Sequence, residues 1–410
     1  MKKNNKLIIL LVLIIIILSM LFILIPSKKE NEIKLIKIID LIGKDINYAE
    51  NYAKKNNLFL KIDYEHSDNI DKNFIISQNN KKDNKTIELI VSLGPINKEI
   101  FKEKKVNEIG KVPVMMYHGI YNLSNSDTGY TGGNVDKDGY NRTKESFIND
   151  LEFYYQKGYR MVRLEDYVNG IIDVPLGYSP IVLTFDDGLK NNINILGKDE
   201  EGKLIIDENS AVGILEQFKK KYPDYNVTAT FFINGGLFNQ PEYNIEIIKW
   251  LVENGYDIGN HTYSHYNMEK LTIDETKKEI GRLYNFLKEI IPNKYVKIVA
   301  LPFGTPYSLD HPNRPFILNG EYEGIKYNTI STLRVGYESE LSPFSKNFDK
   351  TYIKRIRAYD NNGNDFDIEY NFKKLDNNRY VSDGNKHTIT IKEEDLEYVN
   401  EIYADKVITY

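Results

Sequence analysis

Hydrophobic residues are concentrated at positions 7–25, a run of 19 residues in which Ser19 is the only polar member. A helix needs about 20 apolar residues to span a bilayer. Lys2, Lys3 and Lys6 precede the run, so the positive-inside rule places residues 1–6 in the cytoplasm. A cleaved signal peptide is the alternative, but no Ala-x-Ala pattern precedes residue 30. We expect a transmembrane helix over 7–25 and a single-pass protein of the cell membrane.

Residues 33–95 form the next patterned stretch. Positions 46–57 have helical spacing of small and apolar residues, and positions 58–64 and 86–93 alternate between apolar and polar residues. Gly94-Pro95 closes the stretch with a turn signal. The pattern predicts a small α+β module with one helix and paired strands. Residues 96–111 are charged, lack apolar periodicity and indicate a linker.

Apolar runs alternate with amphipathic segments between residues 112 and 357. The runs predict strands at 112–117, 159–162, 180–185, 227–233, 256–259 and 296–301, and helices at 142–158, 245–254 and 273–290. Such β–α alternation favours an α/β fold with a parallel sheet or barrel. Residues 358–410 are a polar extension with strand-like stretches at 366–372 and 388–391, and the pattern does not indicate its role.

The amino-acid composition of the chain excludes several kinds of site and partner. The chain has 410 residues, of which 41% are hydrophobic, so it can bury a core and is not a mostly disordered chain. Cysteine is absent, which excludes disulfides, thiolate zinc sites and cysteine nucleophiles. A transition metal would have to be bound by His, Asp or Glu. The net charge of −5 argues against nucleic acid as a partner.

Two adjacent carboxylates, Asp186 and Asp187, follow the apolar strand at 180–185 within the stretch Thr-Phe-Asp-Asp-Gly. Neighbouring carboxylates repel each other at a strand end, and a cation would relieve that repulsion. The alternative interpretation is a turn that contains a helix-capping aspartate.

His261 and His265 are separated by four positions and follow a strand-like segment. That spacing can chelate one ion, although two surface histidines are the alternative. One carboxylate and two imidazoles would make a three-ligand site for Zn²⁺, Co²⁺, Ni²⁺ or Fe²⁺. Water bound at such a site becomes a nucleophile near neutral pH, and a second carboxylate could remove its proton. The Leu-Pro-Phe-Gly stretch at 301–304 predicts a stiff turn that could present a backbone N–H.

These motifs resemble those of the NodB-homology polysaccharide deacetylases, carbohydrate esterase family 4. The family pattern T-F-D-D-G is matched by residues 184–188, and H-[ST]-x-x-H is matched by residues 261–265. The resemblance covers roughly residues 112–357. It implies an irregular (β/α) barrel and a divalent metal cofactor, with zinc favoured.

The resemblance also implies roles for single residues. Asp186 would be the catalytic base, and Asp187, His261 and His265 would bind the metal. The backbone N–H of Phe303 would contact the oxyanion.

The sequence departs from the family pattern at two motifs. Ala300 occupies the position of the arginine that normally holds the base, and Arg355 could take over that role from a later strand. The family's last motif, which carries a general-acid histidine, has no clear match. His118 could supply the proton, or it could be a hydrogen-bonded residue at a strand end. We interpret His387 as structural.

Residues 33–95 resemble a PASTA domain, a module found on the outer face of Gram-positive membranes. The matching stretches are 41–43, Ala49 and Ala53, Leu58, 76–78 and 91–95. The resemblance implies either wall binding or a spacer.

Together these patterns predict a membrane-anchored, extracellular N-deacetylase whose partner is an N-acetylated cell-wall glycan, with a peptidoglycan amino sugar favoured. A poly-N-acetylglucosamine exopolymer is an alternative substrate, because the stretch Met-Tyr-His at 116–118 resembles deacetylases of that class. A non-catalytic wall-binding or sensing module and an O-acetyl esterase are further alternatives.

Overall fold

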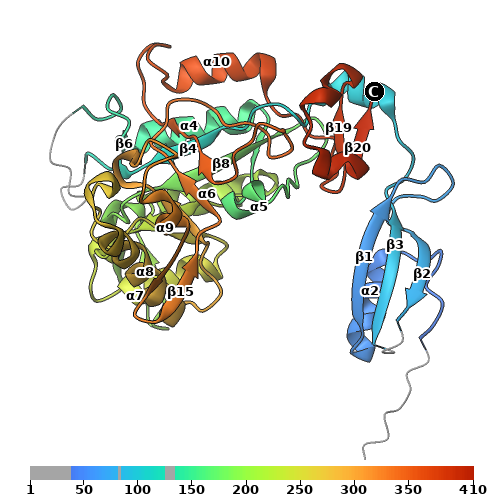
Figure 1. The fold of residues 1–410 in the computed structure, drawn as a ribbon, viewed down its shortest axis with the longest axis horizontal. Helices are drawn as coiled ribbons and strands as arrows, with labels where there is room; N and C mark the ends of the chain where they lie inside the picture. Colours follow the sequence, from blue (N-terminus) through green and yellow to red (C-terminus); the bar gives the residue numbers. More distant parts are fainter. Residues whose placement is uncertain (1–37, 82–84, 125–133) are drawn as a thin grey trace, which may run out of the picture. The chain divides into compact units, whose positions relative to one another are not determined.

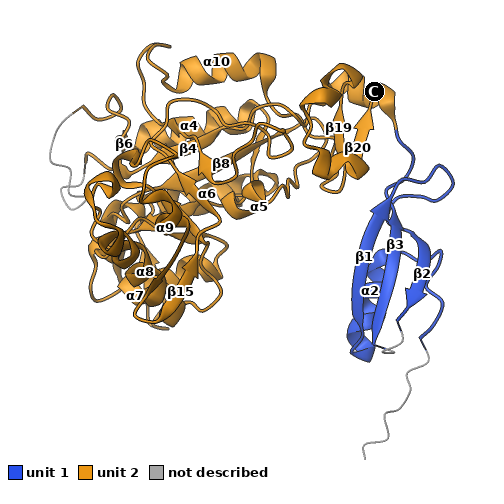
Figure 2. Ribbon diagram, viewed as in Figure 1, with its two compact units in different colours: residues 1–96 blue, residues 97–410 orange. Residues whose placement is uncertain are grey.

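A computed structural model describes residues 38–81, 85–124 and 134–410. The chain divides into two compact units, residues 1–96 and 97–410 (Figure 2). The predicted cytoplasmic tail at 1–6 and transmembrane helix at 7–25 lie outside the described residues. Among the residues that are described, no helix is both long and apolar enough to cross a bilayer.

The first unit consists of one helix and a three-stranded sheet. Its elements are α2 (Ile46–Asn56), β1 (Phe59–Glu65), β2 (Ile75–Asn80) and β3 (Thr86–Ser92). The central strand β3 runs parallel to β1 and antiparallel to β2. The α2 helix begins because the Asp45 side chain accepts a hydrogen bond from the Asn47 N–H, and it ends at Asn57 in a left-handed conformation. Buried alanines on α2 pack with the apolar face of the sheet.

The second unit is built on a nine-stranded parallel sheet (Figure 1). Its strands are β4 (Val114–Tyr117), β7 (Tyr159–Met161), β8 (Ser179–Phe185), β11 (Thr230–Ile233), β12 (Asp257–Asn260), β13 (Ile298–Ala300), β16 (Ser331–Leu333), β17 (Tyr352–Ile353) and β18 (Ile356–Arg357). The hydrogen-bonded order is β17-β16-β13-β12-β11-β8-β4-β18, and β7 also pairs with β8. Every one of these pairings is parallel.

The sheet is curled into a half-barrel. Its two terminal strands, β17 and β18, belong to one short segment and are separated only by Lys354 and Arg355. The six residues 352–357 therefore supply the terminal strand at each end of the sheet. The predicted irregular barrel is not closed by hydrogen bonds, because β17 and β18 do not pair with each other.

Helices and four short two-stranded pairs complete the unit, two of the pairs antiparallel and two parallel. The helices are α3 (Lys98–Lys104), α4 (Lys144–Gln156), α5 (Leu164–Val168), α6 (Ala211–Lys221), α7 (Asn244–Glu253), α8 (Ile273–Ile290), α9 (Arg314–Leu318) and α10 (Ile368–Asn378). The short pairs are β5 (Gly119–Tyr121) with β6 (Asn141–Thr143), β9 (Ile195–Lys198) with β10 (Leu204–Ile206), β14 (Asn319–Tyr322) with β15 (Ile325–Asn328), and β19 (Ile389–Ile391) with β20 (Val407–Thr409).

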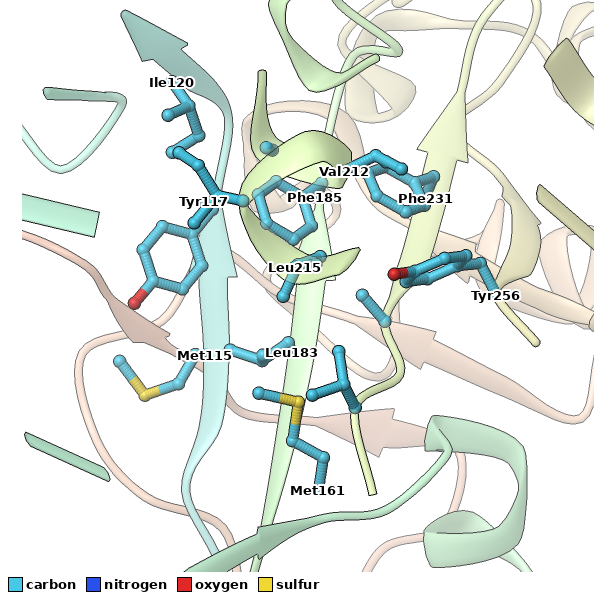
Figure 3. Packing of buried hydrophobic residues seen from close by; sticks show 14 of the residues in the cluster. Met115, Tyr117, Ile120, Met161, Leu183, Phe185, Val212, Leu215, Phe231 and Tyr256 are labelled. Atoms are coloured by element: carbon cyan, nitrogen blue, oxygen red, sulfur yellow. The ribbon is translucent and has the colours of Figure 1, made fainter. Parts of the chain in front are cut away.

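The strands of the sheet are rich in apolar residues because they lie in the hydrophobic core. Every residue of β8 is buried, as a continuous apolar run predicts for a strand covered on both faces. The Phe185 ring lies between the rings of Tyr117 and Phe231, with centroid distances of 5.3 and 4.9 Å (Figure 3). This aromatic stack packs the ends of β4 and β8 beside β11, and the ends of β4 and β8 carry residues discussed below.

Two predictions outside the sheet are wrong. Most of the predicted linker at 96–111 belongs to the second unit, because residues 98–104 form α3 and Val106 and Glu108 are buried. The predicted strand at 366–372 is instead the start of α10. The Asp367 side chain caps this helix, and its buried apolar residues follow the helical spacing i, i+4 and i+7.

The extension at 358–410 is part of the same compact unit. Side chains of α10 enter the same core cluster as the strand residues, and Ile389 and Ile391 of β19 enter a second cluster with residues of β4 and β13. The extension is therefore packed into the fold that carries the sheet.

Candidate active site

The predicted site residues gather at one edge of the sheet, because parallel strands end at the same edge. Asp186 and Asp187 follow β8, His261 follows β12, and His118 follows β4. Phe303 lies in the turn after β13. These segments surround a cavity of about 500 Å³, which His265 also lines.

Three side chains form a candidate metal group. The Nε2 atoms of His261 and His265 each lie 3.2 Å from Oδ1 of Asp187. One ligand atom from each residue lies within 4.8 Å of the others. The two histidines lie in a loop after β12, where His265 has a positive φ of 55°, and not on a helix. Among the described residues this is the only group of three or more potential metal ligands.

The surroundings of His261 fit a metal ligand. Its Nδ1 lies 2.8 Å from the carbonyl oxygen of Ala300 and donates to it, so Nε2 carries the lone pair whenever the imidazole is neutral. Burial lowers the pKa of His261, but the carboxylates of Asp186 and Asp187 outweigh burial and the pKa is raised. Nε2 is buried and has no hydrogen-bond partner among the described residues. A buried, unpartnered nitrogen that faces a carboxylate oxygen and a second imidazole matches the nitrogen and oxygen donors that Zn²⁺ and similar ions prefer.

The pKa values of Asp187 and His265 are both shifted in the direction that favours binding of a cation. Burial raises the pKa of Asp187, but the neighbouring imidazoles outweigh burial and the pKa is well below its usual range. Burial and the adjacent His261 lower the pKa of His265. Asp187 is therefore ionised, and His265 is neutral over a wider pH range than a free histidine, which leaves an oxygen and a nitrogen lone pair free to bind a metal.

Asp186 has a different partner. Nη1 and Nη2 of Arg355 donate hydrogen bonds of 2.7 and 2.6 Å to Oδ1 and Oδ2 of Asp186. Both side chains are almost completely buried. Arg355 also donates to the Arg334 carbonyl oxygen and to the Thr184 hydroxyl. Burial raises the pKa of Asp186, but the Arg355 guanidinium together with His261 and His118 outweighs burial, so the pKa lies below its ordinary value.

His118 lies beside Asp186. Its Nε2 is 4.0 Å from Oδ2 of Asp186, and its ring centroid is 5.0 Å from that of Tyr140. Burial lowers the pKa of His118. His387, in contrast, lies in the turn before β19 and is not among the residues that line the cavity.

Phe303 forms one wall of the cavity. Its ring centroid is 5.0 Å from that of His265, and the residue is 54% exposed. The φ of Phe303 is +57°, a conformation that is uncommon for a residue other than glycine. The hydroxyl of Tyr307 donates to the Phe303 carbonyl oxygen at 2.8 Å, which helps hold this turn.

The sequence did not single out several residues that surround these groups. The other lining residues are Tyr121, Tyr140, Asn141, Leu189, Leu301 and Val335. No motif in the sequence indicated that Tyr121, Tyr140 or Asn141 would face the cavity. The Thr184 hydroxyl, which contacts Arg355 and the carbonyl oxygen of Met115, was recognised only as part of a motif.

Comparisons with known proteins agree with this site. Residues 174–311 match the family model described as polysaccharide deacetylase. A peptidoglycan-N-acetylglucosamine deacetylase of Bacillus cereus is 30% identical over 130 residues, which cover 32% of this chain and 38% of that protein. An uncharacterised 30.6 kDa protein of Geobacillus stearothermophilus is 28% identical over 124 residues, 30% of this chain and 38% of that protein. The chain therefore covers well under half of the length of either relative.

Two solved structures resemble parts of this chain at low TM-scores. The deacetylase PplD of Streptococcus pyogenes, in complex with acetate, has a TM-score of 0.43 and 18% identity, covering 61% of this chain and 93% of that one. The peptidoglycan deacetylase PdaC of Bacillus subtilis has a TM-score of 0.25 and 24% identity, covering 34% of this chain and 55% of that one. The family match contains Asp186, Asp187, His261 and His265. Residues 174–311 are thus similar to polysaccharide deacetylases, a family whose reaction class is the hydrolysis of a carbon–nitrogen bond.

Proposed function

We propose that the chain is a metal-dependent hydrolase that removes N-acetyl groups from a cell-wall polysaccharide, with a peptidoglycan amino sugar as the favoured substrate. One observation carries the proposal. Asp187, His261 and His265 present ligand atoms within 4.8 Å of one another, in the same cavity as the buried Asp186. This arrangement provides a metal site and a separate base.

The metal would be a divalent cation held by Asp187, His261 and His265, with zinc favoured and cobalt, nickel or iron as alternatives. Such an ion supplies Lewis acidity, which polarises a carbonyl and lowers the pKa of water.

The chain's own residues would then carry the proton transfers. Asp186 would take a proton from the water that adds to the amide carbonyl carbon, and its lowered pKa keeps it ionised for this task. The backbone N–H of Phe303 would donate to the developing oxyanion. His118 would give a proton to the departing nitrogen as the carbon–nitrogen bond breaks. The products would be acetate and a free amine on the sugar.

The favoured substrate is supported by two features of the chain. One relative is named a peptidoglycan-N-acetylglucosamine deacetylase. The first unit has the helix and strands expected of a PASTA-like module, which would bind the wall or act as a spacer. We further propose that residues 7–25 anchor the protein in the cell membrane with the second unit outside. Membrane fractionation with and without residues 7–25 tests this part.

The direct test uses the full chain in detergent with zinc. Acetate release is measured from purified peptidoglycan and from poly-N-acetylglucosamine, with the Asp186→Asn variant as the control. We expect release from peptidoglycan that depends on Asp186. Release from the exopolymer alone would change the substrate. Stoichiometric zinc binding without acetate from either glycan would favour a non-catalytic wall-binding module and overturn the proposal.

A further inference from the structure

The wall of the cavity next to His118 is formed by the rim segment, defined here as residues 134–143. Tyr140 and Asn141 of this segment line the cavity, and the Tyr140 ring lies edge-on to His118. The segment includes β6, which pairs with β5, so that the Gly119 N–H donates to the Tyr140 carbonyl oxygen at 3.2 Å. The position of Tyr140 therefore depends on what holds the rim segment in place.

Arg142 connects the rim segment to two other parts of the unit. The residue is only 4% exposed. Its Nη2 and Nε donate to the two carboxylate oxygens of Asp150 on α4 at 2.6 and 3.0 Å. Its Nη1 donates to Asp360 at 2.6 Å and to Asp136 at 3.4 Å. One guanidinium thus links α4, the rim segment and the extension that follows β18.

Residues 357–360 contact the rim segment at two more points. The Asp360 N–H donates to the Asp136 carbonyl oxygen at 2.7 Å. Gly139 has a φ of +77°, and a Cβ added there would lie 3.1 Å from the Cβ of Arg357, so the turn rests directly on this residue. The extension therefore supports the turn that leads into Tyr140 through backbone, side-chain and packing contacts.

The same network reaches the strand that carries His118. The Tyr117 hydroxyl donates to Oδ2 of Asp150 at 3.0 Å, and Asp150 is the carboxylate that Arg142 binds with two nitrogens. Asp136, at the other end, accepts hydrogen bonds from the Thr143 N–H and hydroxyl at 2.8 and 2.9 Å. Tyr117, the neighbour of His118, and Arg142, two residues after Tyr140, thus share Asp150 as a hydrogen-bond partner.

We propose that Arg142 and Asp360 are positioning residues that hold Tyr140 beside His118, and that this is a role of the first residues of the extension. The contribution to catalysis rests on the proposed deacetylase function, whereas the hold on the rim segment does not. The substrate group affected would be the sugar that enters the cavity between Tyr140 and Phe303.

The two positioning residues differ in how safely they can be changed. Removal of Arg142 would leave Asp150 buried without its cation, which endangers folding. The Asp360 side chain is 46% exposed, so its removal leaves no buried charge unpaired. Asp376 offers a matched control, because its side chain is 49% exposed and pairs at 2.7 Å with Lys157, the residue after α4, and not with Arg142.

The experiment compares Asp360→Ala with Asp376→Ala in the full chain, using hydrogen exchange of the amides of Gly119 and Thr143 and the steady-state kinetics of acetate release. We expect Asp360→Ala to lower protection at these amides and to raise KM by about three- to tenfold, because it removes one half-exposed charged hydrogen bond. Asp376→Ala should change neither. Asp360→Asn keeps an acceptor oxygen for Arg142 and should restore part of both effects.

Equal protection in the two alanine variants would overturn the proposal. Lower protection in Asp360→Ala with unchanged KM and kcat would overturn the positioning role. If the unchanged chain releases no acetate, the proposed function fails, while the exchange comparison still decides whether Asp360 holds the rim segment. Arg142→Lys, measured by the same exchange, provides a second variant if it folds.

Discussion

Asp186 and Asp187, two adjacent carboxylates at the cavity, differ in burial and in the groups that contact them. Asp186 and Asp187 are neighbours in the chain, but Asp186 is 1% exposed and paired with Arg355, while the Asp187 side chain is 26% exposed and faces two imidazoles. β8 ends at Phe185, and the chain turns at Asp187, whose φ is +74°, so the two carboxylates that follow the strand face different partners. The comparison shows how identical side chains obtain separate tasks from their surroundings.

Burial raises the pKa of both carboxyls, and opposing groups lower both, but the opposing groups differ. For Asp186 the main opposing group is a guanidinium that never loses its charge, and for Asp187 it is a pair of histidines. A metal ion could replace the positive charge on the Asp187 side only. The Asp186 side already contains its own cation, so its carboxylate stays available to accept a proton.

The largest effect is expected for Asp186→Asn, which should lower the rate of acetate release without changing the metal content. Asp186→Asn removes the proposed base but leaves Asp187, His261 and His265 unchanged. We expect the rate of acetate release to fall by about 10²- to 10⁴-fold, the usual contribution of general base catalysis. Metal content, measured by mass spectrometry of the purified protein, should stay at the level of the unchanged chain. Loss of the metal from this variant would contradict the division between the two sides.

The next effect concerns Arg355. Arg355→Gln leaves a buried carboxylate without its cation, and such a loss costs about 3–5 kcal/mol of unfolding free energy. Because the pKa of Asp186 is lowered in the folded protein, its ionisation adds stability above the ordinary pKa that is lost as the pH falls. The variant should lack this contribution, which denaturant titrations at several pH values would measure.

The same variant should shift activity along the pH axis. Without Arg355, burial dominates and raises the pKa of Asp186, so the acidic limb of the pH–rate profile should move to higher pH. Arg355→Lys keeps a positive charge and should shift the limb less. An acidic limb that stays in place in Arg355→Gln would show that Asp186 is not the group that must be ionised.

A smaller effect is expected from metal-linked stability. A ligand present at 100 times its Kd stabilises the folded state by about 2.7 kcal/mol. Zinc at that excess should raise the free energy of unfolding of the unchanged chain and of Asp186→Asn by this amount. Asp187→Asn should gain much less, and an equal gain would place the metal elsewhere.

The smallest effect concerns Phe303. Its exposed ring is available to pack against a sugar, whereas its proposed catalytic contribution comes from the backbone. Phe303→Ala should therefore raise KM for the glycan by a few-fold, roughly 1 kcal/mol of lost ring contact, and leave kcat nearly unchanged. A large fall in kcat would indicate that the turn itself has moved.

The sequence predicted the sheet better than its surroundings. The fully buried β8 and the strongly amphipathic α8 have unambiguous periodicity, and the observed α8 has the predicted bounds. The stretch 366–372 was assigned the wrong period, because its helix depends on the Asp367 cap and on packing against the core. Glu108 bonds to residues near 380 and 390, and the Val106 carbonyl oxygen accepts from Tyr410; local patterning does not reveal such distant contacts.

The residues of the candidate site, like the elements around the sheet, could be predicted only where a local pattern marks them. Asp187, His261 and His265 could be singled out because each belongs to a dense local motif at a strand end. Tyr140 and Asp360 belong to no motif, and their relation to the site arises only where β6 and the segment after β18 meet. Arg355 was a candidate because Ala300 occupies the position of the family arginine, and its two hydrogen bonds to Asp186 depend on the curl of the sheet.

The most direct test of the account is a paired measurement of bound metal and acetate release in the unchanged chain and in His261→Ala, after metal removal by a chelator and reconstitution with zinc. The account predicts one zinc ion per unchanged chain with recovered acetate release, and loss of both in His261→Ala. A His261→Ala protein that retains its zinc and its activity would contradict the claim that Asp187, His261 and His265 hold the ion on which the reaction depends.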